Sequence, residues 1–439
     1  MSVDEEKDHE AQPAAPTSPP TQQSITANPT AADPPPDGGL HAWLQVLVGH
    51  LTVFNSFGQI NSFGIYQSHY TSTFALSPST ISWIGSLQIL LIYGVGALSG
   101  RALDAGHFRP TLALGLALQV LGTFATSAAE GAYWRLLLAQ GVCQGLGMGL
   151  AFCPAVANAA TYFARRRVVA ISCVACGGAT GGMVFPAIAQ TLLGRVGFAW
   201  TVRVIGFVVL FNAAVILALA RTRGQRVAVV GDGGGAPLID WAAFREIPYL
   251  LYCVSMFFAF WGIWVAYYYV RAYARDILDF SDKDSFNLIL IINGVGVPGR
   301  LVPAIIADRF FGPVNVFIPV IFVAGICLFC WAAVSSPAGM IAFVVFYGFF
   351  GAGTQSLLQA ALASLNTDIK KAGVRIGMGF SVVGLASLTG SPIGGALLEQ
   401  KGGQYLYAQV FAGGTMVIGS LILVAARISK TGFILRERM

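Results

Sequence analysis

Charge is scarce in this sequence. Only 10% of the 439 residues are Asp, Glu, Lys or Arg and 55% are hydrophobic, whereas soluble domains carry about 25% charged residues. An ordinary soluble enzyme is therefore excluded. No nucleotide-binding glycine loop, metal-ligand cluster or nucleophile–base pair stands out, so we expect no catalytic residue, no metal, no cofactor and no enzymatic activity. The net charge of +6 comes without a basic and aromatic array, which argues against a nucleic-acid partner.

Features of secreted proteins are also missing. The N-terminus is acidic and polar, so we expect no secretory signal peptide. All seven cysteines fall in apolar segments, where a thiol usually serves as a small packing residue. Cys173 with Cys176, and Cys327 with Cys330, have the spacing of a CxxC pair, and a metal or redox site is the alternative for them.

Long apolar runs fill most of the chain. A bilayer core is about 30 Å thick, and about 20 apolar residues cross it as a helix. We predict an all-α polytopic membrane protein with twelve transmembrane helices in two six-helix halves. The predicted spans are 42–66, 79–100, 110–128, 132–158, 168–192, 200–220, 248–270, 285–307, 314–334, 338–363, 374–397 and 404–426.

The segments between the runs suggest the domain boundaries. Residues 1–36 contain eight prolines and little that could be buried, which predicts a disordered cytoplasmic tail. We expect an N-terminal six-helix half at 37–220, a cytoplasmic linker at 221–246, a C-terminal six-helix half at 247–427 and a cytoplasmic C-terminal tail at 428–439.

Basic residues gather on one side of the predicted spans. That side carries Arg101, Arg109, Arg165, Arg166, Arg167, Arg221, Arg223, Arg226, Arg245, Arg309, Lys370, Lys371, Arg375, Arg427, Lys430, Arg436 and Arg438. The opposite loops hold Arg195, Arg271, Arg275, Lys283 and Lys401, several of them beside acids. Since basic residues are retained in the cytoplasm, both termini are predicted to be cytoplasmic.

The fifth span is preceded by three arginines at 165–167 and then runs for about twenty residues without a charge. It contains glycines at 177, 178, 181 and 182. Glycines at this spacing let helix backbones approach each other in lipid, so we predict a packing face here. Pro186 predicts a bend near the end of the span.

Two motifs carry a family resemblance. Asp37-Gly-Gly-Leu-His-Ala-Trp43 precedes the first span, and Tyr162-Phe-Ala-Arg-Arg-Arg-Val-Val-Ala170 enters the fifth. They resemble the D-G-G-x-x-x-W and Y-F-x-[KR]-R-R-x-x-A signatures of the monocarboxylate-porter family, most closely its fungal members. The stretch Gly100-x-x-x-Asp104-x-Gly106-x-x-Arg109 resembles the loop 2–3 signature of the major facilitator superfamily, with its glycine one place earlier than usual.

The resemblance implies the major facilitator fold, in which two halves move a small molecule by alternating access around a central cavity. It implies gating roles for Asp104 and Arg109 in loop 2–3 and for Asp308 and Arg309 in loop 8–9, with topology anchoring as the alternative. Asp37 is expected to accept backbone N–H bonds at the start of the first span.

Arg300 lies in the middle of the eighth span, with apolar residues for several turns on both sides. An ionisable group at this depth is costly and usually faces a cavity. A guanidinium can hold a carboxylate with two hydrogen bonds. We therefore predict that Arg300 anchors an anionic substrate, with a buried structural partner as the alternative. Arg203 is a weaker candidate because it could extend to the membrane interface.

Several uncharged polar residues could line the same cavity, and hydrogen bonding between helices is the alternative for each. They are Asn55, Asn61, Gln59, Asn293, Gln88, Asn158 and Gln355. The family's proton-coupled lactate carriers have an aspartate where Gly296 stands and a lysine about where Asn61 falls. No other Asp, Glu or Lys lies deep in a span. Proton coupling would therefore need another route, or the protein moves something else.

These observations predict a secondary active transporter of an organic anion or a carboxylated metabolite. Its expected partners are a small anionic molecule and the lipid bilayer, and its expected location is the plasma membrane. The alternatives are an exporter of a fungal secondary metabolite, a carrier of a vitamin-like solute, and a non-transporting membrane sensor or scaffold. The short central loop and short C-terminal tail disfavour the sensor.

Overall fold

A computed structural model describes residues 35–129, 131–223, 240–365, 372–400 and 402–432. In this part of the chain every regular element is a helix. They are α1 Leu40–Asn61, α2 Phe63–Phe74, α3 Pro78–Asp104, α4 Phe108–Ser127, α5 Tyr133–Leu136, η1 Leu137–Gln144, α6 Gly145–Ala160, α7 Arg167–Leu219, η2 Trp241–Arg245, α8 Ile247–Asp276, α9 Asp282–Ile306, η3 Ala307–Phe311, α10 Pro313–Trp331, α11 Pro337–Leu365, α12 Ala372–Gln400 and α13 Leu406–Thr431.

The helices account for the twelve predicted crossings. Ten of the described helical segments are long and apolar enough to span a membrane. One of them, α7, has 53 residues, and Gly197 interrupts it with φ 76°. Because 53 helical residues would measure about 80 Å, far beyond one bilayer core, α7 supplies two crossings. The remaining crossing consists of α1 and α2. It is not among the ten because it contains more polar residues than they do.

The predicted boundaries differ from the helices mainly at three places. The first crossing continues to Phe74, about two turns beyond the predicted end at 66, α8 continues to Asp276 and α13 to Thr431. Most of the predicted N-terminal tail and linker, and the last residues of the C-terminal tail, lie outside the described residues. The domain boundaries stay a prediction.

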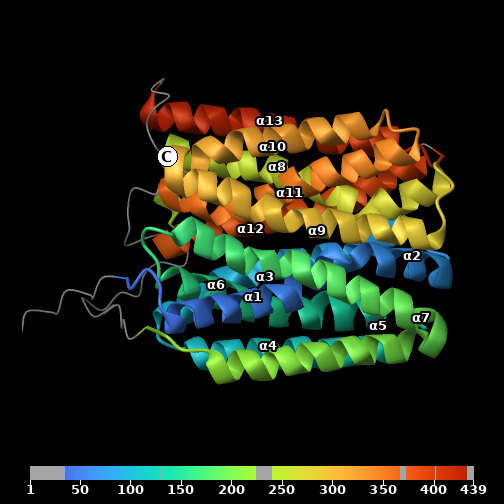
Figure 1. The fold of residues 1–439 in the computed structure, drawn as a ribbon, viewed down its shortest axis with the longest axis horizontal. Coiled ribbons are helices and arrows are strands. Elements are labelled where there is room, and N and C mark those ends of the chain that lie inside the picture. The colour runs from blue at the N-terminus through green and yellow to red at the C-terminus, as the bar shows by residue number, and fades with distance from the viewer. Residues whose placement is uncertain (1–34, 130, 224–239, 366–371, 401, 433–439) are drawn as a thin grey trace, which may run out of the picture. The chain divides into compact units, whose positions relative to one another are not determined.

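The helices lie side by side in two groups. In Figure 1 the elements coloured blue to green lie below those coloured yellow to red. Across the boundary α3 packs along α12, α7 packs along α9, and α2 meets α8. The chain enters α1 and leaves α13 at the same end, on the left of Figure 1. We call this the termini end, and the opposite one the far end.

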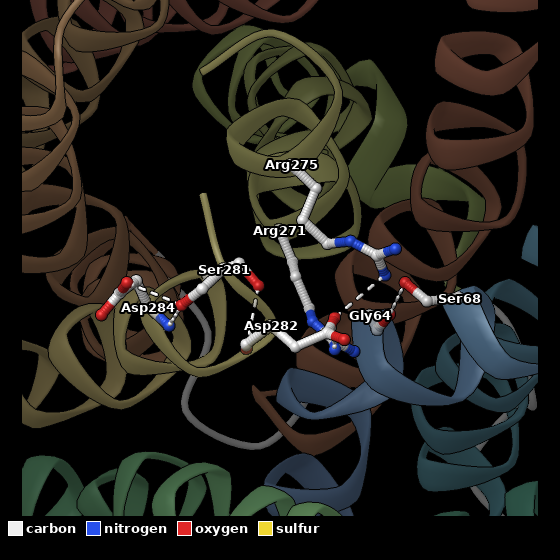
Figure 2. A network of polar contacts seen from close by, with 8 residues as sticks. Gly64, Ser68, Arg271, Arg275, Ser281, Asp282 and Asp284 are labelled. Carbon is white, nitrogen blue, oxygen red and sulfur yellow. Dashed lines mark hydrogen bonds and ion pairs between the residues drawn. The ribbon is translucent and has the colours of Figure 1, made fainter. Parts of the chain in front are cut away.

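Capping residues explain two of the helix starts. Ser77 accepts a hydrogen bond from the Thr80 N–H, and Pro78 occupies the first turn of α3. Ser281 accepts from the Asp284 N–H, and Asp282 and Asp284 lie in the first turn of α9, where a helix end favours negative charge (Figure 2). Both starts lie at the far end, so capping fixes where the chain re-enters the membrane there.

The glycines of α7 pack against α1. A Cβ added to Gly177 would overlap the His50 carbonyl oxygen, and one added to Gly181 would lie 2.5 Å from the Phe54 oxygen. Two neighbouring glycines have other surroundings: Gly182 faces Asn293 of α9, and Gly178 lies near Phe57 and Arg300. Gly177 and Gly181 therefore let the backbones of α1 and α7 meet, whereas Gly178 borders side chains between the helices.

We expect Gly177→Ala and Gly181→Ala to destabilise the folded protein by about 1–3 kcal/mol, because each methyl group would force α1 away from α7. Gly194→Ala is the matched control, since it lies on the same helix with no atom within 4 Å of an added Cβ. The measurement is the thermal unfolding temperature of detergent-solubilised protein. Equal unfolding temperatures for all three variants would contradict the packing role.

Candidate functional site

A cavity lies between the two groups of helices. About 40 Å³ of it can hold the centre of a water molecule, and the space between its side chains, part of it open to the outside, amounts to about 440 Å³. One wall comes from α1, α3, α6 and α7, and the other from α9 and α11. The lining residues are Val53, Phe57, Tyr93, Phe152, Val156, Ile171, Val174, Ala175, Arg300, Gln355, Ser356 and Gln359.

Arg300 is the charged residue of this cavity. Its side chain is only 2% exposed. One Nη donates to the Gly296 carbonyl at 3.1 Å, and the other donates to the Gln355 Oε1 at 2.8 Å. The Nε and the Gln355 Nε2 are buried without a hydrogen-bond partner. No carboxylate of the described residues forms an ion pair with Arg300, so its charge is held by dipoles alone.

Gly296 contributes to this arrangement. It stands one helical turn before Arg300, and a Cβ at this position would lie 2.8 Å from an Arg300 Nη. The guanidinium therefore occupies the space that a larger side chain would fill, and the Gly296 carbonyl is its acceptor on α9.

The other predicted substrate-binding residues are spread over several places. The Asn61 amide donates to the Gly178 carbonyl at 3.0 Å, and the Asn293 amide donates to Ile289 of its own helix. Both of their Oδ1 atoms are buried without a partner. Asn61 and Asn293 thus lie against the α7 glycines that flank the cavity, although neither is among its lining residues.

Four predicted polar residues make bonds inside the N-terminal group of helices. Gln59 donates to Asn55 of its own helix, and Asn55 accepts from Asn212. Gln88 donates to Gln144 of η1 at 3.1 Å. Asn158 donates to the Arg221 carbonyl at 2.9 Å near the termini end. The bonds of Asn55 with Asn212, of Gln88 with Gln144 and of Asn158 with Gln45 join different helices, as the alternative expects, whereas the Gln59 bond lies within α1. Gln355 is the predicted residue that joins Arg300 at the cavity.

Among the predicted gating residues, Asp308 connects the two groups of helices. Its carboxylate accepts from the Val169 N–H in the first turn of α7 at 3.0 Å. Arg309 is exposed and has no partner among the described residues. Arg109 donates to the Leu217 carbonyl at 3.1 Å, a contact within the N-terminal group. The Asp104 side chain lies outside what the structure describes. The gating roles stay a prediction.

Different contacts join the two groups at the far end. The Ser82 and Tyr269 hydroxyls lie 2.9 Å apart, and Ser79 donates to the Pro392 carbonyl at 3.0 Å. The rings of Phe63 and Tyr268 are 5.0 Å apart. These contacts connect α2 and α3 with α8 and α12, so they close this end over the cavity.

An ion-pair cluster lies beside this closure. Arg271 and Arg275 of α8 pair with Asp282 at the start of α9, with N–O distances of 3.3 and 3.4 Å (Figure 2). Figure 2 also shows α2, with Ser68 and Gly64, next to this cluster. The basic residues expected beside acids in this loop are therefore paired, and they hold the turn between α8 and α9.

The two signature motifs meet at the termini end. Asp37 accepts from the N–H groups of Ala164 at 2.6 Å and Arg165 at 2.8 Å, and its own N–H donates to the Tyr162 carbonyl. The rings of Trp43 and Phe163 are 5.3 Å apart. The expectation that Asp37 caps the first span is wrong. Gly39 occupies that position without a side-chain cap, and the carboxylate caps the turn before α7 instead.

His50 is a polar residue that the sequence reading missed. It lies about 15 Å along α1 from Leu40 and is half-buried. Its Nδ1 is 2.9 Å from the Cys173 carbonyl oxygen and its Nε2 is 3.0 Å from the Thr180 hydroxyl. The signal was available, because a histidine inside an apolar span needs a partner as much as a lysine does.

Twelve membrane crossings in two groups, with a central cavity that holds a buried cation, define a multi-pass membrane transporter. The chain belongs to the major facilitator superfamily, whose family model matches residues 49–373.

Relatives of known name agree. An MFS-type transporter of Gibberella zeae is 43% identical over 408 residues, covering 92% of this chain and 91% of the relative. An aspyridones efflux protein of Emericella nidulans is 34% identical over 412 residues, covering 92% and 82%. An agnestins efflux protein of Paecilomyces divaricatus is 30% identical over 433 residues, covering 97% of both.

The Asp37 contact predicts a pH-dependent stability. The Ala164 N–H, followed by the N–H and charge of Arg165, holds the pKa of the Asp37 carboxyl below its usual value of 3.8. Because the pKa of Asp37 is lower in the folded protein than in the unfolded chain, its ionised carboxylate stabilises the fold. This stabilisation is complete above the unfolded-state pKa and is lost as the pH falls through the folded-state pKa. Asp37→Ala should therefore unfold at a lower temperature than the parent at pH 7, and the difference should shrink toward pH 3.

The measurement is thermal unfolding in detergent at both pH values. Asp37→Asn is the control, because it keeps a hydrogen-bond acceptor and tolerates the positive φ of 52° at this position. A difference between Asp37→Ala and the parent that is the same at pH 7 and pH 3 would show that the charge of Asp37 does not contribute.

Proposed function

We propose that this protein exports a small organic anion, with Arg300 as its anchor. The observation that carries the proposal is the cavity geometry around Arg300. A guanidinium that is 2% exposed and lacks an ionic partner among the described residues is energetically costly. A ligand carboxylate, enolate or phenolate would supply the missing negative charge and occupy the Nε donor that has no partner.

The names of the relatives support export. Two of them are efflux proteins, and both match more than nine-tenths of this chain. The plasma membrane is the location that we propose, because an exporter acting there releases its substrate from the cell. The Asp37 and Tyr162 motifs support the monocarboxylate-porter branch, since the two signatures form one contact. The cavity reaches Ile171 and Val156, close to the termini end, which fits loading from the predicted cytoplasmic side.

Arg300→Lys should weaken binding of an anionic ligand although the charge is kept. A lysine ammonium cannot reproduce the two-pronged hydrogen bond of a guanidinium. Losing one charge-assisted bond corresponds to about a ten- to hundred-fold loss of affinity. The probe pair is 2-naphthoate and its neutral amide, and the measurement is equilibrium dialysis against the protein in lipid nanodiscs.

The control is Arg203→Lys. Arg203 lies over the Trp200 ring at 4.9 Å, outside the residues that line the cavity, so this change should leave binding as in the parent. Equal affinity of the parent for the acid and the amide would overturn the anionic-substrate proposal. So would an Arg300→Lys variant that binds the acid as tightly as the parent.

We also propose that transport is coupled to protons through His50. Imidazole has two ring nitrogens, so it can carry one proton or two. A carbonyl only accepts, so Nδ1 donates to Cys173 and Nε2 is the site that gains the proton. The Thr180 hydroxyl can donate to a neutral Nε2. Alternatively it can donate to the Gly177 carbonyl at 3.1 Å and accept from a protonated Nε2. Both protonation states are therefore fully hydrogen-bonded.

The α7 groups that contact this imidazole are the Cys173 carbonyl and the Thr180 hydroxyl. The nearby Cys176 thiol contacts the Val297 carbonyl of α9 instead, and Arg300 of α9 lies near Gly178, with an Nη 3.7 Å from an added Cβ. His50 is also close to residues that line the cavity. Val53 lies three residues after His50 on α1, and Val174 directly follows its partner Cys173 on α7. A charge at His50 would thus alter the contact between two helices that line the cavity.

We expect His50→Gln to retain substrate exchange and to lose accumulation driven by a pH gradient. The probe is radiolabelled naphthalene-2-sulfonate in proteoliposomes, since a sulfonate stays ionised and does not cross lipid as a neutral acid. The control is His107→Gln in the exposed loop before α4. Gradient-driven accumulation by His50→Gln at the rate of the parent would exclude this histidine as the proton carrier.

A further inference from the structure

The cavity has two walls of different chemistry. The wall from α9 and α11 carries Arg300, Gln355, Ser356 and Gln359. The wall from α1, α3 and α6 carries Phe57, Tyr93 and Phe152, with aliphatic residues beside them. Each wall belongs to a different group of helices, so a ligand that contacts both must have a polar edge and an apolar edge.

The polar wall has hydrogen-bond donors without partners. Arg300 Nε and Gln355 Nε2 are both buried and unpaired, while Gln355 Oε1 already accepts from Arg300. The Tyr93 hydroxyl forms no hydrogen bond among the described residues, and Tyr93 lines the same cavity as Arg300. Because these free groups donate, the complementary ligand edge consists of acceptors with negative charge.

The apolar wall is an array of rings in edge contact. Phe152 meets Phe57 at 5.1 Å between ring centroids with an interplanar angle of 63°, and it meets Tyr93 at 6.2 Å and 87°. Further rings extend the array across the boundary between the groups. Phe380 of α12 lies 5.3 Å from Tyr93, and Trp264 of α8 stacks on Phe57 at 6.4 Å and 18°.

This array differs from an ordinary aliphatic lining. Aromatic rings prefer edge-to-face or offset partners at these separations, because the ring edge is positive and the ring face is negative. A flat unsaturated ligand can join such an array as one more ring. A saturated ligand of the same carbon skeleton is thicker and has no quadrupole, so it gains only the burial of apolar surface.

We infer that the substrate is a planar conjugated acid, with its anionic group on Arg300 and Gln355 and its ring system against Phe57, Tyr93 and Phe152. This inference rests on the proposed function, and it specifies the substrate class of the same cavity. Such a molecule contacts both groups of helices at once. Its binding therefore depends on how far apart the groups stand, as alternating access requires.

The experiment compares 2-naphthoate with decahydro-2-naphthoate, using purified protein in nanodiscs and equilibrium dialysis. Both probes carry the same carboxylate on the same carbon skeleton, and the saturated acid has at least as much apolar surface. The hydrophobic effect alone would not favour the aromatic acid. We expect the parent to bind 2-naphthoate about two- to ten-fold more tightly than the saturated acid.

Phe152→Leu should bring the two affinities together, because leucine keeps the apolar contact and removes the ring. The matched control is Phe124→Leu, a ring on α4 that pairs with Phe207 and does not line the cavity. This variant should keep the preference of the parent. A Tyr93→Phe variant should keep the preference for the flat acid and weaken both acids alike, because it retains the ring and removes the hydroxyl donor.

The outcomes separate this inference from the proposed function. If the parent binds both acids equally and Arg300→Lys weakens both, the anionic anchor stands and the conjugated-acid inference is overturned. If the parent binds 2-naphthoate no better than its amide, the anchor fails. Retention of the full aromatic preference by Phe152→Leu would also overturn the role of the ring wall.

Discussion

The structure depends on how closely α1 and α7 pack. In a bilayer no hydrophobic force drives one helix against another, so association relies on close van der Waals contact and hydrogen bonds between helices. Glycines at 177 and 181 bring the α7 backbone against His50 and Phe54. Hydrogen bonds also join the same pair of helices, among them those from Asn61 to Gly178, between His50 and Cys173, and between His50 and Thr180. Both helices also supply residues to the cavity, so this packing sets its width.

The second constraint is the buried charge of Arg300. Dipoles of Gly296 and Gln355 stabilise it only in part, and two donors nearby have no partner. A protein interior normally satisfies such groups, and those left open in a cavity mark a place for a ligand. The same feature makes the cavity selective for anions, since hydrogen-bond donors without partners favour a ligand with negative charge.

Different contacts join the two groups of helices at the two ends. At the far end hydroxyl and carbonyl groups join α3 to α8 and α12, and an ion-pair cluster lies beside them. At the termini end the carboxylate of Asp308 caps α7 across the boundary. Both sets consist of few hydrogen bonds between otherwise apolar helices, so they can break and form again as the two groups move.

The sequence by itself determined the membrane class, the twelve crossings and the depth of Arg300, because apolar runs and isolated charges are local properties of the chain. Only the tertiary structure decided which polar residues meet. Gln355 reaches Arg300, whereas Gln88 and Asn158 bond elsewhere. Asp37 caps a turn more than a hundred residues away, and Phe57, Tyr93 and Phe152 form one wall. These pairings follow from how each helix is rotated and how it crosses its neighbours, and hydropathy along one helix does not encode either angle.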